Sequence, residues 1–172
     1  VTVSLHPAGH VLGSAQIRIE HRGEVWVVAG DYKTDPDPTC APFEAVPCDV
    51  FVTESTFGLP VFDWPDAEVV ARDVRRWWEE NSAAGRTSLL SAYALGKSQR
   101  LLAMLLDPPG PIAVHGALDR LLEPYRERGV ALPETRYASP DVAKEIRGRG
   151  LVIGRGLVVG EVGPPDLEHQ LI

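Results

Sequence analysis

The chain has 172 residues, of which 44% are hydrophobic and 24% charged, a composition typical of a folded globular chain rather than a disordered one. Its formal net charge of -7 at pH 7 argues against a surface that attracts nucleic acid through bulk positive charge. A nucleic-acid partner is not excluded, because acidic and basic residues can gather on different parts of one surface. With no apolar stretch near the ~18 residues of a membrane-spanning helix, no signal peptide and no CxxC pair, we expect a reduced, cytoplasmic protein without a membrane partner.

The amino-terminal part of the sequence predicts strands. The pattern of apolar and polar residues predicts strands at about 16–21, 24–29 and 50–53. The first two are close enough in sequence to form a β-hairpin, which would bring the segments that flank it to one rim of a sheet. A Pro-rich turn at 59–65 follows, and we place a domain boundary between residues 58 and 59.

After this turn, helical and strand patterns alternate. Asp66 is expected to cap a helix that Gly85 ends, with an apolar face formed by Ala67, Val70, Val74, Trp77 and Trp78. Further strands are predicted at 87–92, 112–115 and 151–153, and further helices at 97–106, at 117–128 with a kink or early end at Pro124, and from Ser139 onward. Such alternation is typical of a parallel sheet covered by helices. We therefore expect an α/β domain at 59–153, and we assign no function to the tail at 154–172.

Two residues at the rim of the predicted hairpin have metal-binding chemistry. His10 lies in a loop with a glycine on either side, and Asp31 follows the apolar strand that ends at Gly30. Imidazole nitrogen and carboxylate oxygen are ligands of zinc, and a zinc site with few protein ligands keeps room for the water used in metal-assisted hydrolysis. The alternative is that His10 caps a turn and Asp31 merely ends a strand.

Four segments in chain order resemble motifs of the β-CASP group of metallo-β-lactamase-type nucleases. Residues 8–15 (AGHVLGSA) are similar to the group's third metal motif, and residues 29–32 (AGDY) to the motif of its metal-bridging aspartate. Residues 52–58 (VTESTFG) are similar to the segment that opens the inserted β-CASP domain, and residues 91–99 (SAYALGKSQ) to a strand-turn-helix inside that insertion. Residues 115–121 (HGALDRL) are most similar to the bacterial DNA-ligase-associated exonuclease branch.

This resemblance, which covers about residues 3–153, implies a partial metallo-β-lactamase domain, rich in strands, at 1–58 and a β-CASP-like α/β domain after it. It implies two zinc ions in the intact enzyme, with His10 on one ion and Asp31 bridging both and acting in catalysis. The ligase-associated branch implies that the substrate is DNA, that the enzyme is an exonuclease of DNA repair or ligation, and that a DNA ligase is a functional partner. An RNA-processing nuclease of the same group is the alternative.

Glu54 is a further catalytic candidate, at the carboxyl end of the predicted strand 50–53. By resemblance it is the acidic residue of the motif that opens the insertion, where it would help to place a late histidine near the leaving group. A carboxylate that binds an imidazole fixes its tautomer and favours its protonated form. The alternative is that Glu54 caps the following turn through the backbone amides of Ser55 and Thr56.

Gly96, Lys97 and Ser98 are candidate substrate-binding residues. They lie between a predicted strand and a predicted helix, where backbone amides at a helix start can bind a phosphate group. The alternative is a plain tight turn. The GxxxxGK[ST] spacing of a nucleoside-triphosphate loop is absent, so we exclude that class of ligand.

The first metal motif of the β-CASP group, His-x-His-x-Asp-His, does not occur among the five histidines of the chain. His6, His21 and His115 are interpreted as structural or exposed residues. We expect the chain to be an internal fragment, inactive alone, whose remaining ligands would precede Val1 and follow Ile172. Two other functions stay open: a metallo-β-lactamase-type hydrolase of small esters, against which the α/β insertion argues, and a non-catalytic piece that binds nucleic acid or protein.

Overall fold

The computed structural model describes residues 1–62 and 64–154 and divides into two compact units, with the division after residue 63. The sequence places this boundary at 58/59, within the same connection. Within this connection, the rings of Phe57 and Phe62 lie edge-to-face with centroids 5.0 Å apart. Of the tail predicted at 154–172, only Gly154 lies within the described residues. None of the described helices combines the length and the apolar character needed to cross a membrane.

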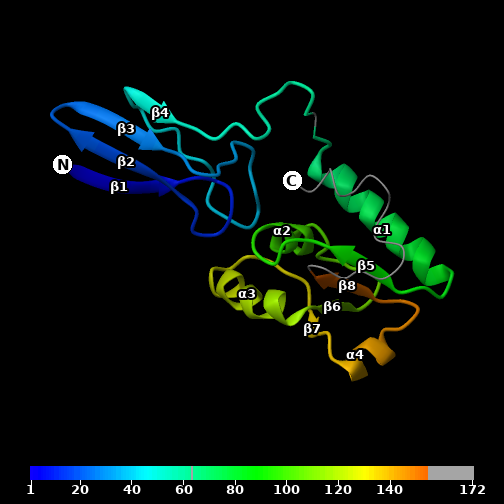
Figure 1. Ribbon diagram of the computed structural model, residues 1–172. Helices are drawn as coiled ribbons and strands as arrows, with labels where there is room; N and C mark the ends of the chain where they lie inside the picture. Colours follow the sequence, from blue (N-terminus) through cyan, green and yellow to red (C-terminus); the bar gives the residue numbers. More distant parts are fainter. Residues whose placement is uncertain (63, 155–172) are drawn as a thin grey trace. The chain divides into compact units, whose positions relative to one another are not determined.

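The first unit is a four-stranded sheet in the order β1-β2-β3-β4 (Figure 1). Its strands are β1 (Thr2–Pro7), β2 (Ala15–His21), β3 (Glu24–Val28) and β4 (Val50–Val52). β1, β2 and β3 are antiparallel neighbours, whereas β4 pairs with β3 in parallel. The three predicted strands are confirmed. The prediction misses β1, although apolar and polar residues alternate there as expected of a strand.

β2 and β3 form the predicted hairpin through a two-residue turn at Arg22 and Gly23. Both residues have a positive φ, 53° and 84°, as a type I′ turn requires. The pairing of Ile17 with Val28 places the start of β2 beside the end of β3. The loop before β2 and the segment after β3 therefore leave the sheet at the same end, opposite the turn.

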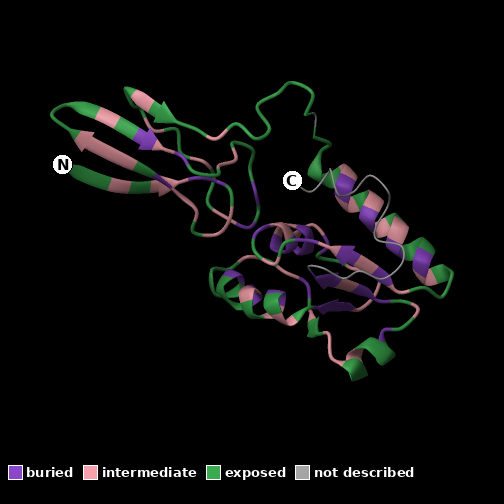
Figure 2. Ribbon diagram, in the orientation of Figure 1, coloured by how far each residue is buried: buried purple, intermediate pink, exposed green. Residues whose placement is uncertain are grey.

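The two faces of this sheet differ in polarity. Cross-strand pairing places eight apolar side chains on one face: Val3, Leu5, Ile17, Ile19, Trp26, Val28, Val50 and Val52. These side chains are partly or largely exposed, and Figure 2 shows little buried surface along the four strands. On the opposite face, Gln16 and Val27 are fully buried. The small core of the first unit therefore lies on the face that carries Gln16.

The second unit is a parallel sheet in the order β5-β8-β6-β7, with helices around it. Its elements are α1 (Ala67–Ala83), β5 (Ser88–Ser91), α2 (Lys97–Ala103), β6 (Ile112–Val114), α3 (Gly116–Glu127), β7 (Arg136–Tyr137), α4 (Pro140–Glu145) and β8 (Leu151–Gly154). Figure 1 shows α2 and α3 beside each other on one side of the strands and α1 on the other. The parallel pairing confirms the α/β arrangement expected for this part of the chain.

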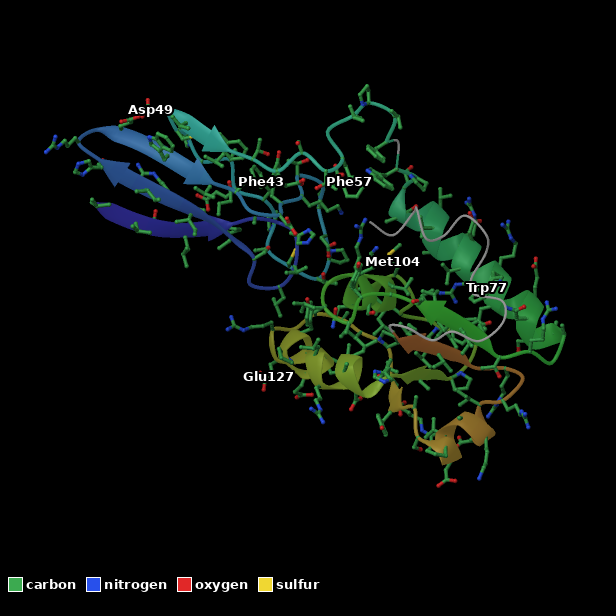
Figure 3. The ribbon with its side chains drawn as sticks, viewed as in Figure 1. Phe43, Asp49, Phe57, Trp77, Met104 and Glu127 are labelled. Atoms are coloured by element: carbon green, nitrogen blue, oxygen red, sulfur yellow. The ribbon has the colours of Figure 1, made fainter. Side chains whose placement is uncertain are left out.

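The core of the second unit is built from α1, α2, α3 and the central strands. On α1, Val70, Val74 and Trp78 are buried as predicted, and Trp77, labelled in Figure 3, packs against the core from its edge. The indole N–H of Trp78 donates to the carbonyl of Arg149 (2.9 Å), which joins α1 to the segment before β8. This hydrogen bond satisfies the one polar group of a fully buried ring.

Several predicted details of the second unit differ from the structure. Asp66 stands at the N-cap position of α1, but its side chain makes no capping hydrogen bond, so that prediction is wrong. The helix begins instead with backbone bonds from Val69 and Val70 to the Asp66 carbonyl. α2 ends at Ala103, earlier than predicted, and the sequence pattern does not predict β7. α3 runs through Pro124 rather than ending there.

Candidate metal centre

The loop at residues 8–14 that presents His10 closes on itself. The amide of Ala8 donates to the Ser14 carbonyl (3.1 Å), and the Ser14 hydroxyl accepts from the amides of His10 (3.2 Å) and Val11 (3.1 Å). These bonds fix the backbone at His10. Its side chain is 44% exposed and therefore accessible to a ligand.

Asp31 is presented by the chain as it leaves β3. The amide of Ala29 donates to the carbonyl of Val52 (3.0 Å), which continues the pairing of β3 with β4 by one residue. Gly30, with a φ of 60°, then turns the chain. Asp31 follows directly, with 78% of its side chain exposed.

Tyr32 anchors the segment that carries Asp31. Its ring contacts those of Phe43 and Phe51, with centroid separations of 5.4 and 5.9 Å, and its hydroxyl accepts from Thr53 (3.1 Å). Phe43 belongs to the long connection between β3 and β4 (Figure 3). Aromatic packing therefore fixes the backbone next to a largely exposed carboxylate.

The two segments meet at the rim predicted from the hairpin. His10 Nε2 lies 3.9 Å from Asp31 Oδ2. Two donors of one tetrahedral zinc ion, each about 2.1 Å from the metal, lie about 3.4 Å apart, so a small side-chain adjustment would let both bind one ion. Imidazole and carboxylate are also the right donor chemistry for zinc. The pair fits part of a zinc site.

The pair is not a complete site within the part of the chain that the structure describes. There, no three histidine, cysteine, aspartate or glutamate side chains gather where they could hold a metal ion. Cys40 and Cys48 are not part of the pair. Zinc sites in proteins use three or four protein ligands, so His10 and Asp31 supply about half of one.

Glu54 makes the turn-capping interaction that the sequence leaves as the alternative. Its Oε2 accepts from the amide of Thr56 (2.7 Å), just after the end of β4. This bond occupies one carboxylate oxygen. A structural role is therefore visible for Glu54, and a catalytic role would use the acceptor capacity that remains on its carboxylate.

The turn at Gly96, Lys97 and Ser98 is bonded internally. The amide and hydroxyl of Ser98 both donate to the Tyr93 carbonyl (3.2 and 2.6 Å), and the amide of Lys97 donates to the Leu95 carbonyl (3.1 Å). Ser98 is fully buried, while Lys97 lies with Nζ 5.4 Å from the centre of the Tyr93 ring. The expectation of unoccupied amides at this helix start is therefore wrong for residues 97 and 98.

Two of the other histidines have visible structural contacts. His6 lies between the Ser4 hydroxyl (3.0 Å from Nε2) and Glu44 Oε1 (2.9 Å from Nδ1). His115 caps α3, its Nδ1 accepting from the amide of Ala117 (3.3 Å). Both support the interpretation of these histidines as structural residues.

Comparison with known proteins gives no matching family model. The chain is 34% identical over 136 residues to a probable DNA ligase of Opitutus terrae, covering 78% of this chain and 13% of that protein. It is 34% identical over 108 residues to endoribonuclease ysh1 of Aspergillus fumigatus, covering 61% and 12% of the two chains. It is 27% identical over 107 residues to an RNase J-like protein of Methanocaldococcus jannaschii, covering 61% and 25%. The segments of these relatives that match this chain are of the β-CASP metallo-β-lactamase type.

The chain belongs to the β-CASP metallo-β-lactamase family. It spans about an eighth of the length of the first two relatives. Membership confirms the resemblance carried by the segments around His10, Asp31 and Glu54. It also agrees with the mixed α/β content of the two units.

The β-CASP motifs do not reveal how the rim is held together. Sequence reasoning found His10 and Asp31 but missed the groups that position them, among them the Ser14 hydroxyl and the ring of Tyr32. Both lie inside the segments quoted for the resemblance, AGHVLGSA and AGDY. A serine four residues after a loop histidine was the available signal, because serine hydroxyls commonly accept from nearby backbone amides.

Proposed function

We propose that this chain carries part of the active site of a metal-dependent nuclease that hydrolyses phosphodiester bonds. The observation that carries the proposal is the 3.9 Å separation of His10 Nε2 and Asp31 Oδ2 on an exposed rim. Both side chains are held by ordered backbone and remain accessible to a metal ion. The names of two relatives, an endoribonuclease and an RNase J-like protein, support nucleic acid as the substrate class.

In this proposal His10 and Asp31 would hold zinc, His10 through an imidazole nitrogen and Asp31 through its carboxylate. Bound zinc supplies positive charge that polarises the phosphodiester and lowers the pKa of the attacking water. The exposure of both side chains leaves room for substrate at the rim. Glu54 orients an imidazole with the carboxylate oxygen that does not cap the turn.

The distribution of charge supports nucleic-acid binding despite the negative total. Residues 1–62 hold eight acidic and three basic residues, whereas residues 64–154 hold twelve acidic and thirteen basic residues. Residues 64–154 therefore carry no net negative charge, unlike residues 1–62, which hold the candidate metal ligands. The α/β unit repels a phosphate backbone less than the first unit does. Within the candidate substrate turn, Lys97 supplies the positive charge, while Gly96 and Ser98 shape the backbone.

We infer DNA as the substrate and exonuclease action linked to ligation as the role, in the cytoplasm. The relative named as a probable DNA ligase aligns with 78% of this chain, whereas the two relatives named for ribonuclease activity align with 61%. The names of the two ribonuclease relatives support the second candidate function, an RNA-processing nuclease. If the substrate is DNA, the proposed functional partner is a DNA ligase.

The test compares ligand and control variants of the full-length protein. His10→Ala and Asp31→Ala should each lose most zinc and most cleavage of labelled single-stranded DNA, with melting temperatures little changed because both side chains are exposed. His21→Ala and Asp35→Ala remove the same side-chain types at exposed positions of the same unit and should keep both properties. Parallel assays on RNA of the same sequence separate the two substrates. Normal zinc content and turnover in Asp31→Ala would refute the metal site.

A further inference from the structure

We propose that the side-chain amide of Gln16 is the positioning group that sets the separation of His10 and Asp31; this inference rests on the proposed metal site. Gln16 is the second residue of β2, just after the loop that presents His10. Its side chain lies on the more buried face of the sheet and is fully buried. A buried amide has to find its hydrogen-bond partners within the protein.

The amide of Gln16 joins two segments that are far apart in the sequence. Nε2 donates to the carbonyl of Pro7 (2.9 Å) and to that of Glu44 (2.7 Å). Pro7 ends β1 immediately before the His10 loop, and Glu44 belongs to the connection between β3 and β4 that also carries Asp31. Because both partners are carbonyl oxygens, Nε2 and not Oε1 must face them, and both of its N–H groups are used.

Backbone hydrogen bonds continue this junction on either side of Gln16. The amide of Glu44 donates to the Pro7 carbonyl (3.1 Å), and the amide of Lys33 donates to the Ala8 carbonyl (3.0 Å). The Pro7 carbonyl thus accepts from two donors, one of them the Gln16 side chain. Without the amide, the Glu44 carbonyl would lose the Gln16 bond, and backbone bonds would be left with the exposed pair of His6 and Glu44 to join the two segments.

The acceptor end of Gln16 supports a positioning role. Gln16 Oε1 is buried and has no hydrogen-bond partner within the described residues. A buried carbonyl oxygen without a donor lowers stability, and an apolar side chain of similar size would avoid that cost. The two hydrogen bonds that Nε2 donates, to Pro7 and Glu44, therefore explain a glutamine at this position better than packing within β2 does.

The other side-chain link between the segments is weaker. Glu44 Oε1 binds His6 Nδ1 at 2.9 Å, but the Glu44 side chain is 51% exposed. Water competes with exposed ion pairs, which contribute little to stability. The buried amide of Gln16 is not open to that competition, so we place the positioning function there.

The chain offers a matched control for Gln16. Gln99, at the start of α2, is also fully buried, donates through Nε2 to a loop carbonyl, that of Ala94 (2.8 Å), and has an unpartnered buried Oε1. It belongs to the other unit. Gln16→Met and Gln99→Met therefore remove the same chemistry, and only the first removes it next to the candidate ligands.

The zinc dissociation constant of the full-length protein is the first readout. We expect Gln16→Met to bind Zn²⁺ about 10-fold or more weakly than Gln99→Met, the size of effect typical of groups that orient metal ligands. Gln16→Asn, whose shorter amide cannot reach both carbonyls, provides a milder variant should Gln16→Met fail to fold, and it should also weaken zinc binding. Equal zinc affinities in folded Gln16 and Gln99 variants would overturn the proposal.

Hydrogen exchange at the amides of Lys33 and Glu44, measured without metal, is the second readout. Both amides should exchange faster in Gln16→Met than in Gln99→Met, because their bonds cross the junction. Unchanged exchange would refute the junction role. If the unmodified protein binds no zinc, the proposed metal site fails by itself, and the exchange rates still decide whether Gln16 holds the two segments together.

Discussion

Gly9 and Lys33 approach so closely that a Cβ atom on residue 9 would lie 2.3 Å from the Lys33 carbonyl oxygen. The same atom would lie 2.9 Å from the amide nitrogen of Phe43. Gly9 also has a φ of 72°, in the left-handed region that side chains disfavour. Space and backbone conformation therefore both require glycine here, and the residue allows the His10 loop to pack against the segment that follows Asp31.

Gly9→Ala should destabilise the protein and weaken zinc binding together. Gly23→Ala is the control, because Gly23 has a φ of 84° but open space where the methyl group of an alanine would lie. Gly23→Ala should lower the free energy of unfolding by about 1 kcal/mol, through backbone conformation alone. Gly9→Ala should cost more in urea denaturation and should also raise the zinc dissociation constant. Equal stability losses with equal zinc affinities would show that the close approach is unimportant.

Ser14→Ala tests whether the closed loop orients His10. The change removes the hydroxyl that accepts from the amides of His10 and Val11. We expect a loss of about 1 kcal/mol in unfolding free energy, because water can partly replace the acceptor, and a weaker zinc affinity. Ser4→Ala removes a hydroxyl from β1 that binds the His6 ring, and it should leave zinc affinity unchanged. Isothermal titration of both variants with zinc provides the measurement.

The parts of the fold that depend on local sequence were predictable. The hairpin follows from two short strands around a tight turn, and it brings the segments that carry His10 and Asp31 to one rim. The helical face of Val70, Val74 and Trp78 likewise follows from spacing along one helix. In each case the signal lies within a few consecutive turns or strands of the chain.

The positioning contacts of Gln16 were not predictable, because they join residues that are distant in sequence. Nothing in the pattern of β2 shows that Gln16 faces inward and binds the carbonyl of Glu44, 28 residues away. The bond of Ser98 is local but was not predictable either: sequence places Ser98 at a helix start, and only the folded turn directs its hydroxyl to the Tyr93 carbonyl five residues earlier. Hydrogen bonds that depend on loop conformation leave no periodic signal.

The ion pair between Arg136 and Glu145 predicts a pH-dependent contribution to the second unit. Arg136 donates to Glu145 Oε1 (2.6 Å), joining β7 to α4, and this hydrogen bond and the charge of Arg136 hold the pKa of Glu145 below its usual value. A depressed carboxyl pKa stabilises the fold above the unfolded-state pKa, and the effect is lost as the pH falls through the folded-state pKa. Both groups are exposed, so the effect should be small.

Glu145→Gln should therefore lower the melting temperature slightly at pH 7, and the difference from the unmodified protein should vanish in acid. Glu127→Gln, which removes the same charge from the exposed end of α3 (Figure 3), controls for the change in net charge. Added salt should shrink the difference at pH 7, because it screens exposed charges. A difference that persists unchanged at low pH would contradict the assignment to this ion pair.

Glu54→Gln separates the turn-capping role of Glu54 from its proposed catalytic role. Glutamine keeps the size of the side chain and an oxygen that can accept from the Thr56 amide, the bond seen at 2.7 Å. It removes the negative charge that would support a protonated imidazole. If Glu54 only caps the turn, stability should fall by no more than about 1 kcal/mol and turnover should not change.

If Glu54 orients a general acid, Glu54→Gln should lower single-turnover cleavage of DNA on the order of 10²-fold, with zinc content and melting temperature retained. Glu20→Gln is the matched control, since Glu20 pairs with Arg18 on the same sheet, away from the rim. It should cleave at the normal rate. Because the bond to Thr56 survives in Glu54→Gln, a loss of turnover cannot be attributed to an opened turn. Normal turnover with a lowered melting temperature would assign Glu54 to structure alone and remove it from the proposed mechanism.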